Sequence, residues 1–226
     1  MTALGLVCVG GGSGTRFGGD KLATRLAGRT VFELALSALR TTYPDAPLVV
    51  VAPRDSIERW TLELGGAFPG AVFVAGGALR QDSVRAGVEG AVALGAEVVA
   101  VHDAARPLVH PDDVRGVVEA LGRADGAILC RRVDETVKRV AGDDTVLSTV
   151  PRDQLRLALT PQVFRVEALR WAWDEAEQGS VWTDEAALLE EAGMTVRAVE
   201  AVHPNPKLTT TQDLRLLLAL VGRGEA

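Results

Sequence analysis

Cysteine is scarce in this chain, which limits both the fold and the chemistry that it can support. Only Cys8 and Cys130 occur among 226 residues, and each lies inside a segment that we predict to be a buried strand. Neither has the spacing to histidines that a zinc site requires, so a cysteine-histidine zinc site is excluded. We expect two free, buried thiols, as in proteins of a reducing compartment such as the cytoplasm.

Long hydrophobic runs are also missing. The longest uncharged stretch, residues 64–79, is broken by Pro69 and several glycines, whereas a membrane helix needs about 20 consecutive apolar residues. The N-terminus lacks basic residues, and the glycines at 10–12 cut its apolar segment short, which is unlike a secretory signal. We therefore expect no membrane association and a cytoplasmic location.

Positive charge is the minority charge, with 24 Lys and Arg against 30 Asp and Glu and a net charge of −6. Such an acidic chain is not expected to bind long nucleic acids through a general basic surface. Lysine itself is limited to Lys21, Lys138 and Lys207. All other basic residues are arginines, so these lysines are candidates for positions that need a compact ammonium group.

Apolar runs that alternate with helical patterns dominate the rest of the chain. The runs lie at residues 4–9, 47–52, 71–75, 97–102 and 127–130 and are typical of strands covered on both faces. Residues 195–202 are a last strand candidate. Helical patterns lie at residues 30–40, 55–64, 82–94, 111–121, 166–177, 183–192 and 212–221. This order predicts an α/β fold with a Rossmann-like, mostly parallel sheet and helices on both faces.

The pattern changes at about residues 131–155. Polar and apolar residues alternate from 132 to 140, residues 142–144 supply a turn, and 145–150 can return as a partner strand. We predict a protruding two-stranded β-arm. Because an isolated hairpin is marginal in water, we expect the arm to lean on a second subunit; an edge hairpin of the main sheet is the alternative. The chain shows no repeat or linker, which predicts one domain over residues 1–226.

A glycine-rich loop, Gly10-Gly11-Gly12-Ser13-Gly14-Thr15-Arg16-Phe17-Gly18-Gly19-Asp20-Lys21, follows the first predicted strand. Glycines let a backbone approach a ligand closely and turn its N–H groups toward phosphate oxygens. In an open α/β sheet this loop lies in the ligand crevice at the carboxyl ends of the strands. Its own cations, Arg16 and Lys21, favour a nucleoside triphosphate site.

Two other phosphate-binding motifs fit this loop poorly. A Walker loop has a lysine after its second glycine, but Asp20 follows Gly19. A dinucleotide-binding fingerprint can be matched only with the looser spacing of short-chain dehydrogenases. Those enzymes resemble one another in a Tyr-x-x-x-Lys motif, but the single tyrosine here, Tyr43, is followed four residues later by Pro47 instead of a lysine. Both alternatives are disfavoured.

Together with His102-Asp103-Ala104-Ala105-Arg106-Pro107, the loop resembles the 2-C-methyl-D-erythritol 4-phosphate cytidylyltransferases of the non-mevalonate isoprenoid pathway. The resemblance covers nearly the whole chain in the family's order, through motifs at residues 76–84, 136–138, 160–162, 183–186 and 205–209. The first loop departs from the family pattern. Gly10-Gly11 replace two alanines, and Asp20 and Leu22 replace the proline and glutamine that flank the family's lysine.

The resemblance implies a nucleotidyltransferase-type fold and a reaction between two small molecules. The phosphate of methylerythritol phosphate attacks the α-phosphorus of CTP in line, with Mg²⁺, and pyrophosphate leaves. A phosphate nucleophile is already ionised at neutral pH, so no general base is needed. What the transition state needs is positive charge around the reacting phosphorus.

The resemblance also implies the site residues. Those expected to act on the reacting phosphates are Arg16, Lys21, Arg152 and Lys207. Those expected to bind CTP are Gly10, Gly11, Gly12, Gly14, Gly77, Ala78, Arg80, Ser83 and Ala104. Those expected to bind the polyol phosphate are Asp103, Arg106, Thr136, Arg152 and Thr183. Asp103 is also the expected Mg²⁺ ligand, and the arm is expected to deliver Thr136 and Arg152 to the neighbouring subunit of a homodimer.

Three of these residues have simpler structural interpretations. Ser83, expected to bond the edge of the cytosine ring while nearby carbonyls accept from its amino group, could instead cap a helix. Asp103 could cap the turn that follows it, and Arg106 with its following proline could simply set that turn. His102 is expected to be a packed, hydrogen-bonded histidine and not a ligand.

Two other functions share part of the pattern. A cytidylyltransferase for another polyol phosphate, such as ribitol 5-phosphate, would keep the nucleotide motifs and differ only on the substrate side. A non-catalytic nucleotide-binding module would bind CTP without turnover, but it gives no reason for cations and Asp103 to converge.

Overall fold

A seven-stranded sheet forms the centre of the molecule. The computed structural model describes residues 3–11, 19–177 and 179–222, and its main sheet has the order β11-β7-β10-β6-β1-β4-β5. Its strands are β1 (Leu4–Val9), β4 (Leu48–Ala52), β5 (Val72–Ala75), β6 (Val98–Asp103), β7 (Gly126–Arg132), β10 (Arg156–Arg165) and β11 (Val196–Glu200). β1 runs parallel to β4 and β6, β4 to β5, and β7 to β11. The mostly parallel sheet is confirmed.

Strand β10 was not predicted. It lies between β6 and β7 and is antiparallel to both. Its middle contains Thr160-Pro161-Gln162. A proline has no N–H group to donate to a neighbouring strand, so its presence in a sequence argues against a central strand. The structure accommodates Pro161 where the pairing with β7 shifts register, between Ala158 and Gln162.

The apolar runs are explained by two separate cores, one on each face of the sheet. In β1, Leu6 and Cys8 point into one core, whereas Val7 and Val9 point into the other. Because successive side chains of a strand face opposite ways, a strand covered on both sides must be apolar at every position. Both cysteines are buried and free, as predicted.

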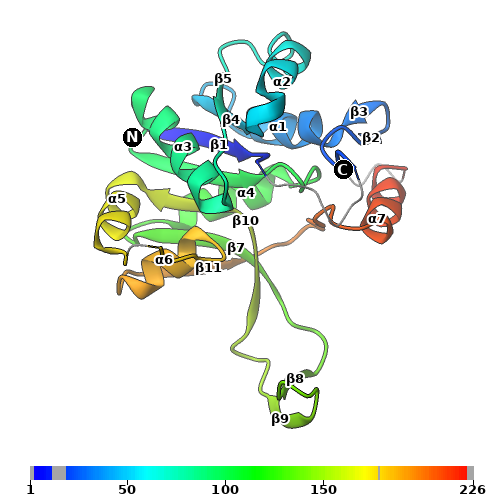
Figure 1. The fold of residues 1–226 in the computed structure, drawn as a ribbon, viewed down its shortest axis with the longest axis vertical. Coiled ribbons are helices and arrows are strands. Elements are labelled where there is room, and N and C mark those ends of the chain that lie inside the picture. The colour runs from blue at the N-terminus through cyan, green and yellow to red at the C-terminus, as the bar shows by residue number, and fades with distance from the viewer. Residues whose placement is uncertain (1–2, 12–18, 178, 223–226) are drawn as a thin grey trace.

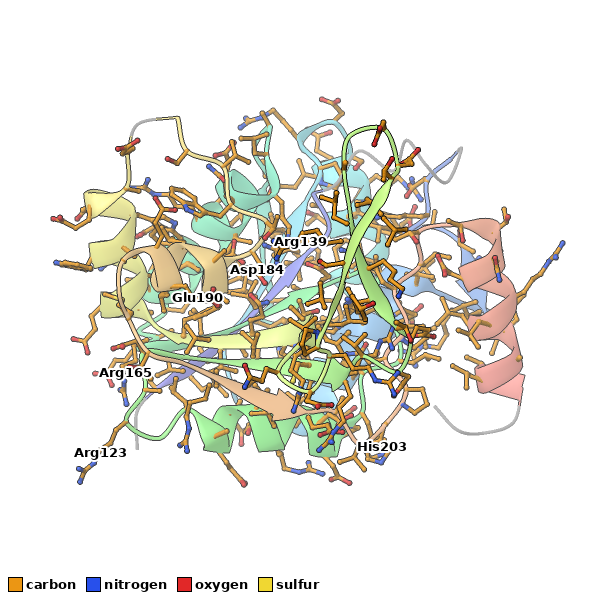
Figure 2. All side chains as sticks on the ribbon, turned by 90° about the horizontal axis from the view of Figure 1, so that it is seen from below. Arg123, Arg139, Arg165, Asp184, Glu190 and His203 are labelled. Atoms are coloured by element: carbon orange, nitrogen blue, oxygen red, sulfur yellow. The ribbon has the colours of Figure 1, made fainter. Side chains whose placement is uncertain are left out.

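Helices cover both faces, which also confirms the prediction. Helices α1 (Val31–Thr42), α2 (Ile57–Leu64), α4 (Pro111–Ala120) and α7 (Thr211–Gly222) contribute to the first core, and α3 (Arg80–Ala93), α5 (Val166–Glu175) and α6 (Glu185–Glu191) to the second. Figure 2 shows α4 on one side of the sheet and α3, α5 and α6 on the other. Short elements, β2 (Arg25–Leu26), β3 (Arg29–Thr30) and the 3-10 turn η2 (Arg54–Ser56), complete the body.

The predicted arm is present as a separate hairpin. β8 (Val137–Val140) and β9 (Val146–Val150) form their own two-stranded sheet, so the alternative of an edge hairpin in the main sheet is wrong. Residues 131 and 132, at the start of the predicted arm, belong to β7, and residue 156, just after its predicted end, begins β10. The arm is therefore an extension of two neighbouring strands, and it projects well beyond the body (Figure 1).

Within the described part of the chain, no helix combines the length and the apolar character that crossing a membrane would require.

Candidate active site

The predicted crevice lies where parallel strands end. Residues 10–11 follow β1, residues 76–77 follow β5, and Asp103 is the last residue of β6. The backbone N–H groups of Gly10 and Gly76 donate to carbonyls of β4 at 2.7 and 2.8 Å. Since the carboxyl ends of parallel strands meet at one edge of a sheet, the first loop, the second glycine segment and Asp103 lie along the same edge.

Ser83 holds two glycine segments close together. Its hydroxyl donates to the Leu79 carbonyl at 3.2 Å and accepts from the Gly77 N–H at 3.1 Å, and the residue is fully buried inside α3. A Cβ on Gly11 or Gly76 would lie 2.6 or 2.8 Å from this oxygen, so neither position tolerates a side chain without a shift. The N-cap of α3 is Leu79, so the interpretation of Ser83 as a helix cap is wrong.

Asp103 collects two cations from distant parts of the chain. Lys207 Nζ lies 2.6 Å from Asp103 Oδ2, and Arg80 Nε lies 3.3 Å from Asp103 Oδ1. Burial alone would raise the pKa of Asp103, but the positive charges of Arg80 and Lys207 outweigh it and hold that pKa well below its ordinary value. Asp103 is therefore ionised at neutral pH, as a metal or cation ligand must be.

Glu185 completes this cluster from the start of α6. Its carboxylate is 3% exposed and accepts from the Arg80 guanidinium at 2.7 Å. Burial raises the pKa of Glu185, and the ion pair with Arg80 opposes that rise. Arg80 thus bridges two carboxylates whose pKa values move in opposite directions. Glu185 belongs to the 183–186 motif, but sequence reasoning gave it no role.

A second network ties the loop after β6 to the segment that carries Lys207. Thr160 Oγ1 accepts from the Asp103 N–H at 3.0 Å and lies 3.1 Å from His102 Nδ1, and His102 Nε2 lies 2.9 Å from the Arg106 carbonyl oxygen. The Arg106 guanidinium donates to the Asn205 carbonyl at 2.7 Å, and the Asn205 amide donates to the Thr160 carbonyl at 2.7 Å.

This network confirms His102 as a packed, hydrogen-bonded residue, fully buried. Desolvation by burial lowers its pKa to about 4, so the ring is neutral at pH 7. The roles of Thr160 and Asn205 were missed. Both lie inside family motifs, at residues 160–162 and 205–209, and membership of those motifs was the signal that could have found them.

In the first loop, Asp20 replaces the family's proline and makes a local cap. Its Oδ1 accepts from the N–H groups of Leu22 and Ala23 at 3.1 and 3.3 Å, and its Oδ2 pairs with Arg59 of α2 at 2.8 Å. Leu22 is buried in the core. The departures at 20 and 22 thus fix both sides of Lys21, which is half-buried. Arg16, Gly12 and Gly14 lie outside the described residues.

Two of the remaining predicted residues lie on the arm, and the others lie at the ends of body elements. Thr136 and Arg152 are exposed on the arm, where the Arg152 guanidinium donates to the Asp134 carbonyl, and the arm extends away from the body (Figure 1). Thr183 is exposed just before the N-cap of α6, and Ala78 is exposed beside Gly77. Ala104, buried directly after Asp103, donates its N–H to β1 at 2.9 Å.

A cleft of about 590 Å³ opens beside Lys207, within the range of small-molecule sites. Its polar lining includes the positive side chains of Arg106, Arg131 and Lys207 and the amide of Asn205. Such a concentration of cations in an acidic chain suits a phosphorylated ligand.

Comparisons with known proteins agree with this geometry. A family model described as IspD, 2-C-methyl-D-erythritol 4-phosphate cytidylyltransferase, matches residues 4–223. The chain is 42% identical over 210 residues to the 2-C-methyl-D-erythritol 4-phosphate cytidylyltransferase of Aeromonas hydrophila, covering 91% of this chain and 84% of that protein. It is 39% identical over 219 residues to a bifunctional enzyme IspD/IspF of Rhodopseudomonas palustris, covering 94% of this chain.

The chain spans about half of that bifunctional relative, 53% of its length. Among solved structures, the 2-C-methyl-D-erythritol 4-phosphate cytidylyltransferase of Thermus thermophilus is 34% identical with a TM-score of 0.78, covering 98% of this chain and 100% of that one. The corresponding synthase of Anaerococcus prevotii has a TM-score of 0.85 at 24% identity, covering 98% and 99%, a likeness of fold.

Proposed function

Because the chain belongs to the family of 2-C-methyl-D-erythritol 4-phosphate cytidylyltransferases, we propose that it transfers the cytidylyl group of CTP to 2-C-methyl-D-erythritol 4-phosphate. The products are 4-diphosphocytidyl-2-C-methyl-D-erythritol and pyrophosphate. The observation that carries this proposal is the convergence of Lys207 and Arg80 on Asp103 at the carboxyl ends of the strands. These residues lie in three separate motifs, and the fold brings them within ion-pair distance.

The cations act by stabilising charge. The α-phosphorus gathers negative charge as the substrate phosphate attacks in line, and positioned ammonium and guanidinium groups lower the energy of that state. In the proposed mechanism Lys207, Lys21 and Arg16 stabilise the charge of the triphosphate, and Arg106 orients the attacking phosphate. Asp103 holds Lys207 in place at 2.6 Å, so its ammonium is positioned before the substrates arrive.

Asp103 also fits a magnesium ligand. Magnesium prefers oxygen donors and is commonly held by one or two carboxylates together with substrate phosphates. Asp103 Oδ1 has the longer of the two cation contacts, 3.3 Å to Arg80. It is the oxygen that can bind an ion, because Arg80 can lose this contact and still keep its ion pair with Glu185. When bound there, Mg²⁺ would neutralise charge on the triphosphate.

The glycine segments support the proposed CTP site. Gly11 and Gly76 pack against Ser83 with no room for a Cβ, which keeps two backbone segments close enough to enclose a base. The Ser83 hydroxyl is fully buried and bonded to Gly77 and Leu79, so in the proposed site it positions the glycine segments, whose backbone carbonyls would accept from the cytosine amino group. A narrow polar slot of this kind would exclude purines.

We propose that residues 1–226 form one domain and that two copies associate through the arm. Each arm would deliver Thr136 and Arg152 to the phosphate of the polyol in the neighbouring crevice. Exposed apolar side chains on the arm support this arrangement: Val140, Val146 and Leu147 are 50%, 59% and 61% exposed, and an isolated hairpin is unstable without a partner surface.

A pyrophosphate-release assay tests the function. The chain is incubated with Mg²⁺ and each of CTP, UTP, ATP and GTP, against methylerythritol phosphate, ribitol 5-phosphate and other polyol phosphates. We expect release only with CTP and methylerythritol phosphate. A preference for ribitol 5-phosphate would establish the second candidate, and CTP binding with no release by any acceptor would establish a non-catalytic module.

A further inference from the structure

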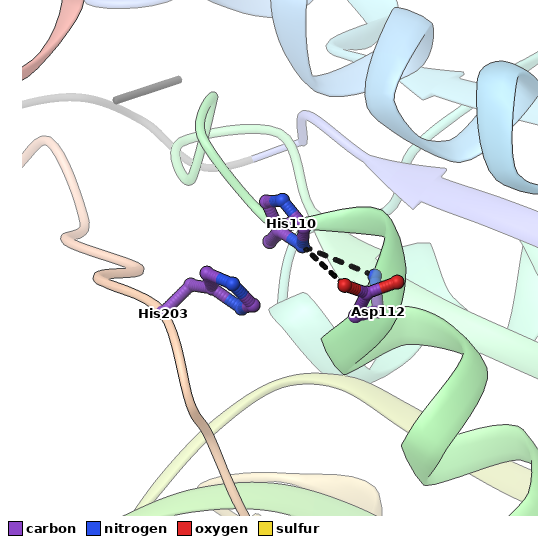
Figure 3. A group of neighbouring side chains, drawn as sticks. All are labelled: His110, Asp112 and His203. Carbon is purple, nitrogen blue, oxygen red and sulfur yellow. Dashed lines mark hydrogen bonds and ion pairs between the residues drawn. The ribbon is translucent and has the colours of Figure 1, made fainter. Parts of the chain in front are cut away.

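Two of the three histidines meet at a place that the proposed reaction does not use. His110 is the N-cap of α4, and His203 lies in the segment between β11 and α7. Their rings stack with centroids 3.6 Å apart and planes at 17°. Asp112 lies beside them, and one ligand atom from each of the three side chains falls within 4.8 Å of the others (Figure 3).

His110 and Asp112 are already spaced as ligands of one ion. His110 Nδ1 lies 3.6 Å from Asp112 Oδ2, and tetrahedral zinc, with bonds of about 2.0–2.1 Å, separates neighbouring ligand atoms by about 3.4 Å. Arg115 occupies the other Asp112 oxygen, Oδ1, at 2.5 Å, which leaves Oδ2 facing the histidines. His110 Nδ1 accepts only the Asp112 N–H, at 3.2 Å, a weak contact that an ion could replace.

His203 contains a buried nitrogen, Nδ1, that has no hydrogen-bond partner among the described residues. It lies 3.3 Å from Asp113 Oδ2, but the ring does not point its N–H at that oxygen. Asp113 is 4% exposed and is held by the N–H groups of Val202 and His203 at 2.9 and 3.1 Å. A buried carboxylate behind a histidine is the usual outer partner of a metal-bound imidazole.

We propose that His110, Asp112 and His203 form a binding site for a divalent transition metal ion of the zinc type, with Asp113 orienting His203. Parallel imidazoles cannot both direct an in-plane lone pair at one ion, so the His203 ring turns on binding. That turn aligns Nδ1 with Asp113 and brings Nε2 toward the ion. Imidazole nitrogens and one carboxylate are ligands that zinc accepts, and water can complete the shell on the exposed side of Asp112.

The site goes beyond the proposed function and does not depend on it. His203 also lines the cleft beside Lys207, but none of the three side chains has a role in the proposed transfer. The site would join the start of α4, which follows the Arg106 loop, to the segment that leads into Lys207. Binding would therefore stabilise the folded chain and brace these two connections against each other.

Titration of the tag-free chain of residues 1–226 with Zn²⁺ tests the proposal, with millimolar Mg²⁺ present to occupy oxygen-ligand sites. The variant pair is His110→Asn, which keeps an N-cap acceptor, and His203→Phe, which keeps an aromatic ring for stacking. Asp45→Asn, which removes an exposed carboxylate elsewhere, is the matched control. We expect the double variant to lose at least tenfold in Zn²⁺ affinity and Asp45→Asn to match the wild type.

Two readouts on the wild type do not depend on the variants folding. Co²⁺ should give the visible absorption of a tetrahedral site, and an anomalous diffraction map at the zinc edge should show a peak between the three side chains. Equal Zn²⁺ affinity in the wild type and the double variant, or an anomalous map with no peak at this place, would overturn the proposal.

Discussion

At the scale of single residues, Asp103 connects elements that the sequence separates widely. It pairs with Lys207 and Arg80, and Arg80 in turn pairs with the buried Glu185. The attraction within a buried ion pair often fails to offset the free-energy cost of removing both charges from water, and replacing such pairs with apolar residues often stabilises a protein. A cluster of this kind at the edge of a ligand crevice is therefore better explained by chemistry than by stability.

Replacing Lys207 tests that explanation. We expect Lys207→Ala to lower kcat/KM by about 10²–10³, the usual effect of removing one preorganised group that stabilises transition-state charge. Lys207→Arg should recover only part of the loss, because a planar fork does not reproduce a compact ammonium. The measurement is pyrophosphate release. Arg123→Ala is the control, since Arg123 is exposed and projects from the molecule (Figure 2); equal losses in both variants would contradict the assignment.

His102 predicts a dependence of stability on pH. Burial lowers its pKa from 6.5 to about 4, so between these values the unfolded chain binds a proton that the folded chain does not. Stability therefore falls as the pH falls from about 6.5 to about 4, by up to about 3 kcal/mol for this residue. Urea unfolding across this range should show a steeper loss for the wild type than for His102→Gln.

The other titrating groups of the site do not explain a difference in pH dependence between the wild type and His102→Gln. Asp103, whose pKa is also lowered, loses its contribution only below its ordinary value of 3.8. Glu185, whose pKa is raised, contributes in the opposite direction and is present in both proteins. Identical slopes for the wild type and His102→Gln would show that the ring is not held neutral.

At the scale of elements, the contact between α3 and the sheet depends on glycine. A Cβ on Gly87 would lie 2.4 Å from Val7 Cγ1 and 2.8 Å from Val51 Cγ2. α3 thus packs directly on β1 and β4, and this contact places Arg80 and Ser83 at the crevice.

Two glycines inside helices should therefore respond to alanine in opposite ways. Gly87→Ala should destabilise by about 1–3 kcal/mol through overpacking. Gly116→Ala, in α4, should stabilise by about 0.5–1 kcal/mol, because no atom of the described residues lies within 4 Å of an added Cβ and alanine favours the helix. Urea unfolding measures both. A Gly87→Ala protein as stable as the wild type would mean that α3 can shift without cost.

Strand β10 shows where sequence patterns failed at this scale. Apolar runs identified the central parallel strands β1, β4 and β6, because burial on both faces leaves no other composition. β10 breaks that rule in its middle, where Thr160 serves the Asp103 network instead of the core. A strand that carries functional polar residues loses the pattern by which strands are recognised.

At the scale of the whole molecule, the proposed exchange of arms makes a prediction that distinguishes it from a self-contained site. In a heterodimer of one Arg152→Ala and one Lys207→Ala subunit, one site would combine an intact arm with an intact crevice. We expect about half of the wild-type activity per dimer, because one of two sites is complete. Differently tagged subunits allow the heterodimer to be purified and assayed for pyrophosphate release.

The matched control places both substitutions in one subunit and pairs it with a wild-type subunit. If arms cross, each site then lacks one residue and this heterodimer is inactive. If each arm serves its own crevice, the outcomes are reversed, and the doubly substituted heterodimer retains half the activity while the other has none.

The sequence by itself determined the α/β class, the central parallel strands, a two-stranded hairpin after residue 131 and the family; the structure decided that this hairpin is separate from the main sheet. These features follow from local patterns. An apolar run forms a strand that is covered on both faces, alternating polar and apolar residues form a strand that is covered on one face, and the family motifs occur in order along the chain. Only the tertiary structure decided that Asp103 meets Lys207 and Arg80, that Glu185 and Thr160 support them, and that His110 stacks on His203. Those contacts join residues far apart in the chain, and their distances depend on strand order and helix packing, which no local pattern encodes.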